Sequence, residues 1–433
     1  MKGYRFLVPI LLIITMLYST YSHVSINIEN KKKYDTYVEK AREYASQGIV
    51  VDSLDNYKEA IAMIDTVDMR IEAAEMLVKN EFADESVAWL EGAVEKYPKS
   101  SKLYEKLLKQ YISTENFDKS YELIDEIQKR NLVTKSIKEL YSTIKYKYEL
   151  DLDRYENVTS LGESYFAITK NEKQGLLYKD KTVLFNQFDY IGSYSDELIS
   201  VSYEGEYYYV DKDGNKRKVP PKEIKCEYLG DICEGLIVVK ENGKYGYYDK
   251  EFKKQFGEYD YATNFNEGIA AVKKENHWYL MDKKGKQIGD RYYSDIKKSE
   301  NNIAFKNERA FVLIDDNYYM VDKNGKIIGD SQYEDAKVFE EKNSYAAVKV
   351  GGTWSFVDKN GKKIFDAAYD EAKSFSLEVG AVKKDGHWGF VDKNGKMVIT
   401  NTFTDVKPFS SEGITYVSDT EGWMMLSLYR YMD

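Results

Sequence analysis

The carboxylates that recur along the second half of the chain are the residues that come nearest to a chemical site. An aspartate recurs six times, at Asp211, Asp249, Asp282, Asp322, Asp358 and Asp392. Glycine usually follows three residues later, and in three copies the segment reads Asp-Lys-Asn-Gly. Because these acids recur as turn residues, we interpret them as groups that cap a turn through its own backbone. Asp211 and Asp213 resemble the start of a calcium loop, but no third carboxylate follows in register.

The sequence shows few signs of a metal site, a disulfide framework or a catalytic nucleophile. His23, His277 and His387 are the only histidines, and none has a partner at helical spacing, so we expect no zinc site. Cys226 and Cys233 are too few for a disulfide framework, which leaves one disulfide or two free thiols open. No glycine-rich phosphate loop or serine elbow occurs. We therefore predict that the protein is not an enzyme and has no cofactor.

Composition limits the partners of this 433-residue chain. The formal net charge is −10, and acidic and basic residues are interspersed. This balance predicts no nucleic-acid partner, because nucleic acid requires clustered positive charge. The chain contains 40 tyrosines, which combine apolar area with a polar tip. Such residues suit half-buried sheets and wet binding surfaces.

The N-terminal segment indicates where the protein resides. Lys2 and Arg5 precede an uncharged stretch over residues 6–28, whose strongly apolar part covers residues 6–18. That part has the length of a signal-peptide core, but no good small-residue cleavage site follows it. The whole stretch could cross a bilayer. We predict a membrane anchor over residues 1–29, with a cleaved signal peptide as the alternative. The expected location is the cell membrane with extracytoplasmic domains, or secretion.

Residues 30–150 have the pattern of paired amphipathic helices. Tyr57, Leu90 and Leu123 are spaced 33 residues apart, each on the second helix of an expected hairpin. We expect three helix pairs and a closing helix over residues 134–148. The segment from Ala41 to Ala60 and the Tyr97-Pro98 ending resemble tetratricopeptide repeats, with a generic array of helical hairpins as the alternative. The concave face of such an array can hold a peptide, or the array can act as a spacer.

Residues 151–433 contain eight copies of one β unit. An aromatic position defines them, occupied by Gln174, Tyr207, Tyr245, Trp278, Tyr318, Trp354, Trp388 and Trp423. The gaps are 33, 38, 33, 40, 36, 34 and 35 residues. Asn-Gly between β-prone runs predicts a hairpin, because both residues tolerate positive φ. Each unit is therefore expected to be a small antiparallel meander, and the Tyr-Asp segment before it a fourth short strand or a loop.

These units resemble the WG-repeat family of bacterial proteins. Trp388-Gly389 matches the pair for which that family is named, and Tyr245-Gly246 nearly does. Segments beginning at Glu234, Glu267 and Glu412 match its Glu-Gly-Leu element. The glycine position departs from the pattern in several copies. The resemblance covers nearly two thirds of the chain and implies a binding or structural role without a defined catalytic site.

The expected fold is a helical-hairpin solenoid followed by an all-β repeat domain. Strands such as residues 278–281 are apolar at successive positions, which indicates sheets that are covered on both faces. A propeller and an open β-solenoid both provide such cover. The atypical first and last copies favour an open array, whereas a count of eight suits closure. We favour the propeller.

The sequence is consistent with two functions. The first is an envelope-associated scaffold that binds a protein or peptide through its repeats. The second is a cell-wall or polysaccharide binder, because residues 278–286 resemble the hairpin of choline-type wall-binding repeats. The repeat aromatics Tyr207, Tyr245, Trp278, Tyr318, Trp354, Trp388 and Trp423 are then either core residues or the lining of a groove that stacks sugars or cages a cation.

Overall fold

The structure is a computed structural model that describes residues 29–162, 165–170, 172–179, 183–342 and 344–429. The chain forms two compact units that divide between Lys145 and Tyr146. The predicted anchor over residues 1–29 lies, except for its last residue, outside the described residues. In the described part, no helix has both the length and the apolar character that a membrane span needs.

The first unit is made of helices that pair in sequence order. A helix over residues 29–46 comes first. It is followed by α2 (Val50–Met63), α3 (Val67–Lys79), α4 (Ala83–Lys96), α5 (Ser101–Ser113), α6 (Phe117–Lys129) and α7 (Lys135–Ile144). Tyr57, Leu90 and Leu123 lie on α2, α4 and α6 and are at most 6% exposed. The 33-residue spacing thus marks the buried face of the second helix in each pair.

The closing helix is shorter than the sequence indicated. We expected it over residues 134–148, but α7 ends at Ile144. Thr134 begins it by accepting a hydrogen bond from the Ile137 N–H through its hydroxyl. After Ile144 the chain enters strand β1 (Tyr148–Leu150), which pairs with a strand of the second unit. For that reason the second unit begins at Tyr146 and not at residue 151.

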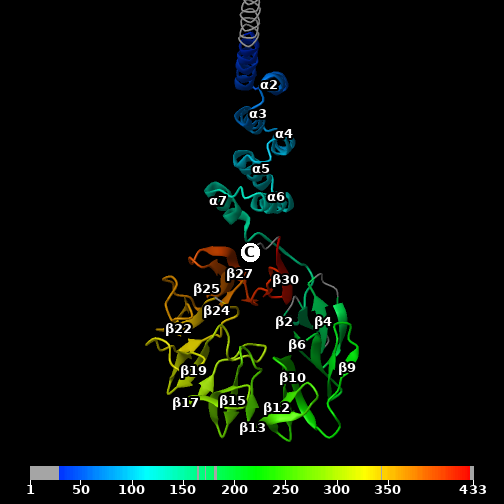
Figure 1. The fold of residues 1–433 in the computed structure, drawn as a ribbon, viewed down its shortest axis with the longest axis vertical. Coiled ribbons are helices and arrows are strands. Elements are labelled where there is room, and N and C mark those ends of the chain that lie inside the picture. The colour runs from blue at the N-terminus through cyan, green and yellow to red at the C-terminus, as the bar shows by residue number, and fades with distance from the viewer. Residues whose placement is uncertain (1–28, 163–164, 171, 180–182, 343, 430–433) are drawn as a thin grey trace, which may run out of the picture. The chain divides into compact units, whose positions relative to one another are not determined.

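The second unit is an eight-bladed β-propeller whose blades follow one another around a ring (Figure 1). Blade 1 is β2 (Asn157–Gly162), β3 (Tyr165–Lys170), β4 (Lys173–Tyr178) and β5 (Val183–Phe188). Blade 2 is β6 (Tyr190–Ser195), β7 (Leu198–Tyr203), β8 (Glu206–Val210) and β9 (Lys216–Lys218). Blade 3 is β10 (Cys226–Cys233), β11 (Leu236–Glu241), β12 (Lys244–Asp249) and β13 (Lys254–Tyr259). Blade 4 is β14 (Tyr261–Ala262), β15 (Ile269–Lys274), β16 (His277–Asp282) and β17 (Gln287–Tyr293).

The remaining blades repeat the same antiparallel order, with the first strand innermost. Blade 5 is β18 (Asp295–Ile296), β19 (Ala310–Ile314) and β20 (Asn317–Val321). Blade 6 is β21 (Asp335–Ala336), β22 (Ala346–Val350) and β23 (Thr353–Val357). Blade 7 is β24 (Glu371–Ser376), β25 (Val379–Lys384), β26 (His387–Asp392) and β27 (Met397–Phe403). Blade 8 is β28 (Asp405–Val406), β29 (Ile414–Ser418), β30 (Trp423–Leu428) and β1.

The atypical end copies are the place where the ring closes. In the described part of the last copy β30 is the final strand, and β1 supplies the fourth strand by pairing with β30 from Tyr148↔Leu428 to Leu150↔Leu426. Blade 8 then packs on blade 1, where Phe166 and Tyr416 rings meet at 4.9 Å. Figure 1 shows β30 beside β2. The propeller prediction is confirmed, and the open solenoid is excluded because a closed ring leaves no bare end sheet.

The hairpins lie where the sequence placed them, but the Asn-Gly turn is of a different kind. In Asp392–Lys396 only Gly395 has positive φ, at 79°. The Gly395 N–H donates to the Asp392 carbonyl, and the Asp392 carboxylate accepts the Asn394 and Lys396 N–H groups at 2.9 and 3.0 Å. This aspartate keeps Asn394 right-handed, so the turn is a type I turn closed by glycine.

The two-residue turns that need two positive φ values lie elsewhere in the blade. Asp385 and Gly386 have φ values of 53° and 82° and join β25 to β26. Glu234 and Gly235, at 52° and 84°, join β10 to β11. The Glu-Gly-Leu element is therefore the turn between the first and second strands of a blade.

Successive apolar side chains of one strand pack against different neighbours. Trp278 and Leu280 belong to a core shared with blade 5, whereas Met281 belongs to the core shared with blade 3. Covered faces explain why the strands do not alternate between apolar and polar residues. The cysteines lie at opposite ends of β10, roughly 20 Å apart at about 3.3 Å per residue, and both are free thiols.

Candidate functional site

The seven predicted repeat aromatics all lie at the start of the third strand of a blade. Four are 2–8% exposed, namely Trp278, Tyr318, Trp354 and Trp388. Tyr207, Tyr245 and Trp423 are half-buried. The position is therefore mainly part of the cores between blades, and most of its ring area is not open to a ligand.

A lysine covers the repeat aromatic within each of blades 5 to 8. These lysines occupy one register position, two residues after the first residue of the innermost strand: Lys297, Lys337, Lys373 and Lys407. We call this position the lysine position. Their ammonium groups lie 4.3, 5.3, 4.9 and 5.2 Å from the ring centroids of Tyr318, Trp354, Trp388 and Trp423. Each ring face thus already has a cation bound to it.

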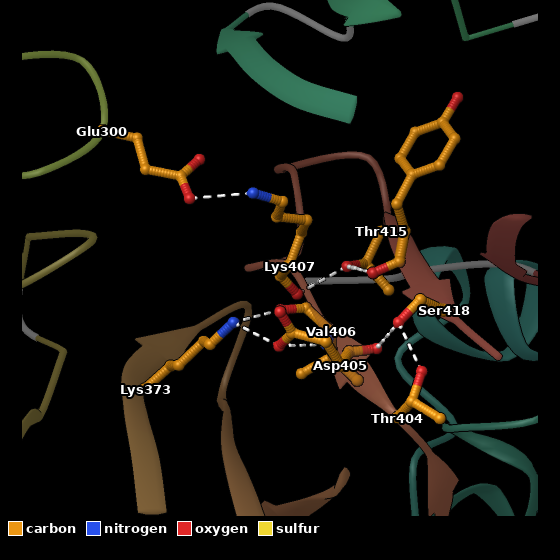
Figure 2. Close-up of polar contacts among 9 residues, drawn as sticks. Glu300, Lys373, Thr404, Asp405, Val406, Lys407, Thr415 and Ser418 are labelled. Atoms are coloured by element: carbon orange, nitrogen blue, oxygen red, sulfur yellow. Dashed lines mark hydrogen bonds and ion pairs between the residues drawn. The ribbon is translucent and has the colours of Figure 1, made fainter. Parts of the chain in front are cut away.

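Three of these lysines also form ion pairs that join blades. The Lys297 ammonium lies 2.7 Å from the Asp335 carboxylate of blade 6. Figure 2 shows Lys373 donating to the Asp405 carboxylate and the Val406 carbonyl of blade 8, at 2.7 and 2.6 Å. The ammonium groups of Lys297 and Lys373 thus contact both a ring and a carboxylate, so these two positions need no ligand.

The other half of the ring has different residues at the same positions. In blades 1 to 4 the same register position holds Thr159, Gly192, Gly230 and Thr263. In blade 3 it is counted from Tyr228, because β10 begins two residues before the residue equivalent to the first residue of the other innermost strands. The carboxylates that begin the innermost strands of blades 5 to 8 are replaced by tyrosine in blades 2 to 4, at Tyr190, Tyr228 and Tyr261. The Tyr190 and Tyr228 ring centroids are 6.0 Å apart. Rings and small residues thus replace the lysine–carboxylate pairs.

The small residues of blades 1 and 2 border a cavity of about 150 Å³. The innermost strands of blades 1 to 3 line one side of it, and residues 300–302 of blade 5 line the other. Thr159 and Gly192 border the space that a side chain at the lysine position would enter. Tyr190, Tyr228 and Asp231 complete the polar part of the wall.

Asp231 is the buried charge of this cavity. Its side chain is 5% exposed. The carboxylate accepts hydrogen bonds from the Ser193 N–H at 2.8 Å, the Ser200 hydroxyl at 3.2 Å and the Asn264 amide at 3.2 Å. Burial raises its pKa to about 6, although these donors lower it. Within the described part of the chain no lysine or arginine forms an ion pair with it, in contrast to Asp335 and Asp405.

Gly192 permits the approach of this carboxylate. A Cβ atom at residue 192 would lie 2.4 Å from an Asp231 oxygen and 2.1 Å from the Ser200 hydroxyl. Any side chain there would displace the carboxylate from its donors. The absence of a side chain at the lysine position of blade 2 is therefore built into the site.

A segment of blade 5 caps the cavity from across the ring. The Asn264 N–H donates to the Asn302 carbonyl at 2.8 Å, and the Asn264 amide donates to the Asn301 carbonyl at 3.1 Å. Glu300 borders the cavity and reaches Lys407 of blade 8 at 2.8 Å (Figure 2). The Asn264 Oδ1 atom is buried and has no hydrogen-bond partner in the described part of the chain.

The recurring acids of the turns are engaged in holding the fold. Glu234 accepts the Gly268 N–H of the next blade at 3.1 Å through both carboxylate oxygens. Glu267 repeats this contact with the Asn307 and Glu308 N–H groups, at 3.0 and 2.7 Å. The Asp211 carboxylate accepts backbone N–H groups of its own turn and pairs with Arg217. Among the described residues no cluster of acids, cysteines and histidines could hold a metal ion.

Sequence reasoning missed Asp231, Gly192 and the capping segment. Two signals pointed there: the longest gap between repeat aromatics, from Trp278 to Tyr318, contains residues 300–302, and the first copy has Gln174 at the aromatic position. Gln174 borders the cavity and accepts the Ile191 N–H at 2.9 Å. Both departures from the repeat thus meet at one place.

Comparison with protein families finds four matches, all in the propeller. The family described as WG containing repeat matches residues 245–278, 320–354, 354–387 and 388–423. The predicted resemblance is confirmed for these segments. No curated protein matches the chain.

Solved structures with similar folds share little sequence with the chain. A eukaryotic initiation factor has 11% identity over 66% of this chain and 91% of its own, with a TM-score of 0.42. Sqt1 from Chaetomium thermophilum has 9% identity over 65% of this chain and 100% of its own, with a TM-score of 0.41. Hsv2 from Kluyvelomyces marxianus has 10% identity over 65% of this chain and 100% of its own, with a TM-score of 0.36.

Proposed function

We propose that the protein is a non-catalytic scaffold of the cell envelope that binds a protein or peptide through its helical and β repeats. The observation that carries the proposal is the use of the recurring charges. Glu234, Lys373 and Asp392 act within turns or between blades, as their contacts show. Groups bound in this way position the blades and are not arranged around a reacting atom. The surfaces of the repeats are therefore the parts of the molecule that would bind the partner.

The helical unit offers an apolar surface for such a partner. Ile49 and Phe82 occupy equivalent positions in successive helix pairs, and each is 38% exposed. Val51 and Val78 lie next to these turns and are 70% and 44% exposed. Apolar side chains that are exposed at equivalent turns of successive repeats can form part of a protein-binding surface. The proposed tetratricopeptide character of this unit fits the same role.

Affinity capture from a solubilised envelope fraction tests the scaffold. The bait is the full chain, and the matched variant carries Ile49→Ser and Phe82→Ser. We expect specific proteins on the unaltered bait that the variant loses while its helical content stays the same by circular dichroism. Recovery of the same proteins on both baits would remove the helical surface from the proposal, and recovery of none would contradict the scaffold itself.

A wall-polysaccharide binder remains the second candidate because of one surface feature. Tyr292 is 58% exposed, and its ring centroid lies 5.7 Å from that of His277 and 5.9 Å from that of Tyr279. An exposed aromatic group of this kind can pack on a sugar face. The test is sedimentation with purified wall material. If the protein stays in the supernatant, or if Tyr292→Ala sediments equally, this candidate fails.

A further inference from the structure

We infer that the cavity between blades 1, 2 and 3 binds the ammonium group of an alkyl amine. The comparison within the ring carries the inference. In blades 5 and 7, a lysine ammonium lies beside an aromatic ring and a carboxylate of the next blade, as with Lys373, Trp388 and Asp405. The cavity presents the same kinds of group but has no lysine of its own.

The partners of a bound ammonium can be named from the wall. Asp231 supplies a buried negative charge that no described basic side chain balances. A buried charge is costly unless a charge of opposite sign pairs with it, so this carboxylate favours a cation. Tyr190 and Tyr228 supply aromatic groups, which also attract cations.

The residues that line the cavity favour an alkyl amine over a metal ion. Asp231 is the one buried carboxylate of the wall, whereas Ca²⁺ and Mg²⁺ require several oxygen ligands. The neighbouring residues Leu161, Ala167 and Ile191 are apolar and suit a methylene chain. The amine can be a free diamine or a lysine side chain of a partner. Only the second source rests on the scaffold function, and the first stands independently of it.

The experiment measures amine binding to the full chain by isothermal titration calorimetry. The probes are 1,5-diaminopentane, N-acetyl-lysine methylamide and the uncharged 1,5-pentanediol. We expect saturable binding of at least one amine and none of the diol. Binding of the diamine alone identifies a free amine as the ligand, and binding of the lysine derivative identifies a partner's lysine. Equal binding of the diol, or no binding of either amine at tens of millimolar, would overturn the inference.

Two variants localise the site, and a third serves as control. Asp231→Asn keeps the size of the side chain and should weaken amine binding at least about tenfold, a loss of roughly 1.4 kcal/mol. Thr159→Lys introduces lysine at the lysine position of blade 1 and should abolish binding by filling the cavity. Asp405→Asn alters a carboxylate that Lys373 already occupies, so binding should stay unchanged.

A pH series on the unaltered protein keeps the test valid if Asp231→Asn does not fold. Amine affinity should fall as the pH drops through about 6, because Asp231 becomes protonated there. The other titratable groups that face it are the phenols of Tyr190, Tyr209 and Tyr228 and the thiol of Cys233, whose pKa values burial raises. These stay neutral between about pH 5 and 8. Amine affinity that does not change over this range would contradict the assignment to Asp231.

Discussion

Blades 5 to 8 and blades 1 to 4 share one backbone plan but differ in how their interiors are completed. In blades 5 to 8, lysines such as Lys297 and Lys373 cover aromatic rings and pair with Asp335 and Asp405. In blades 1 to 4 the equivalent residues are glycine or threonine, and tyrosines replace most of the carboxylates. In blades 5 and 7 a lysine of the ring pairs with a carboxylate of the next blade, whereas the Asp231 carboxylate in blade 3 borders a cavity and has no ion-pair partner among the described residues.

The difference shows how a repeat fold acquires a site. The cavity arises where the repeat pattern is broken, at Gly192, Gln174 and residues 300–302 together. At Gly192 the absence of a side chain makes room for the Asp231 carboxylate of the next blade, which provides the charge.

Replacing a repeat aromatic in the two halves should give the largest contrast. Trp388 in blade 7 is 2% exposed, whereas Tyr207 in blade 2 is half-buried. Trp388→Ala should lower the free energy of unfolding by about 3–5 kcal/mol, because it leaves a large cavity. Tyr207→Ala should cost only about 1–2 kcal/mol. Chemical denaturation measures both, and an equal loss would show that the burial of the repeat aromatic does not determine its contribution to stability. An unchanged midpoint for Trp388→Ala would instead favour the ligand-groove interpretation.

Removing a lysine from blades 5 to 8 tests whether the contacts of its ammonium group with a ring and a carboxylate contribute to stability. Lys373→Met keeps most of the side-chain volume but removes the ammonium from Trp388, Asp405 and the Val406 carbonyl. We expect a loss of about 2 kcal/mol in unfolding free energy, since this group is largely shielded from solvent. Measuring the variant at low and at high salt provides the control. If the loss is the same in both, the ion pair is not its cause.

The buried carboxylate of Asp231 in blade 3 should make the stability of the protein depend on pH. Burial raises the folded-state pKa of Asp231 to about 6, above its usual value, so the folded protein holds that proton more tightly than the unfolded chain does. This stabilisation is present below the unfolded pKa and is lost as the pH rises through about 6. Between about pH 5 and pH 8 the unaltered protein should lose about 1.5 kcal/mol more stability than Asp231→Asn does. Parallel pH profiles for the two proteins would show that Asp231 is already neutral or paired.

Turn acids should contribute least, and similarly in both halves. Asp392→Ala in blade 7 and Asp211→Ala in blade 2 each remove the carboxylate that holds a turn. Each should lower the unfolding free energy by about 1 kcal/mol, because the hydrogen bonds are exposed and water replaces them. Thermal unfolding of both variants checks this expectation. A loss as large as that of Trp388→Ala at either position would show that the carboxylate does more than hold its turn.

Much of the fold could be predicted from the sequence because it depends on local patterns. The spacing of Trp354 and Trp388 gave the blade length, and the Asp-Lys-Asn-Gly segments gave the hairpins. The turn type was mistaken because the Asp392 carboxylate controls the backbone of Asn394. The cavity could not be predicted, because Gly192 and Asp231 belong to different blades and meet only when these blades pack together.

The closure by β1 also determines the order in which the propeller can be completed. β1 is the first strand of this unit to be synthesised, and its partner β30 is the last. The contact between Tyr148 and Leu428 therefore has almost the largest sequence separation that the domain allows, which makes it slow to form. During translation the earlier blades can assemble in turn while β1 still presents an unpaired edge. A ribosome that stops before β30 would release a chain whose ring cannot close.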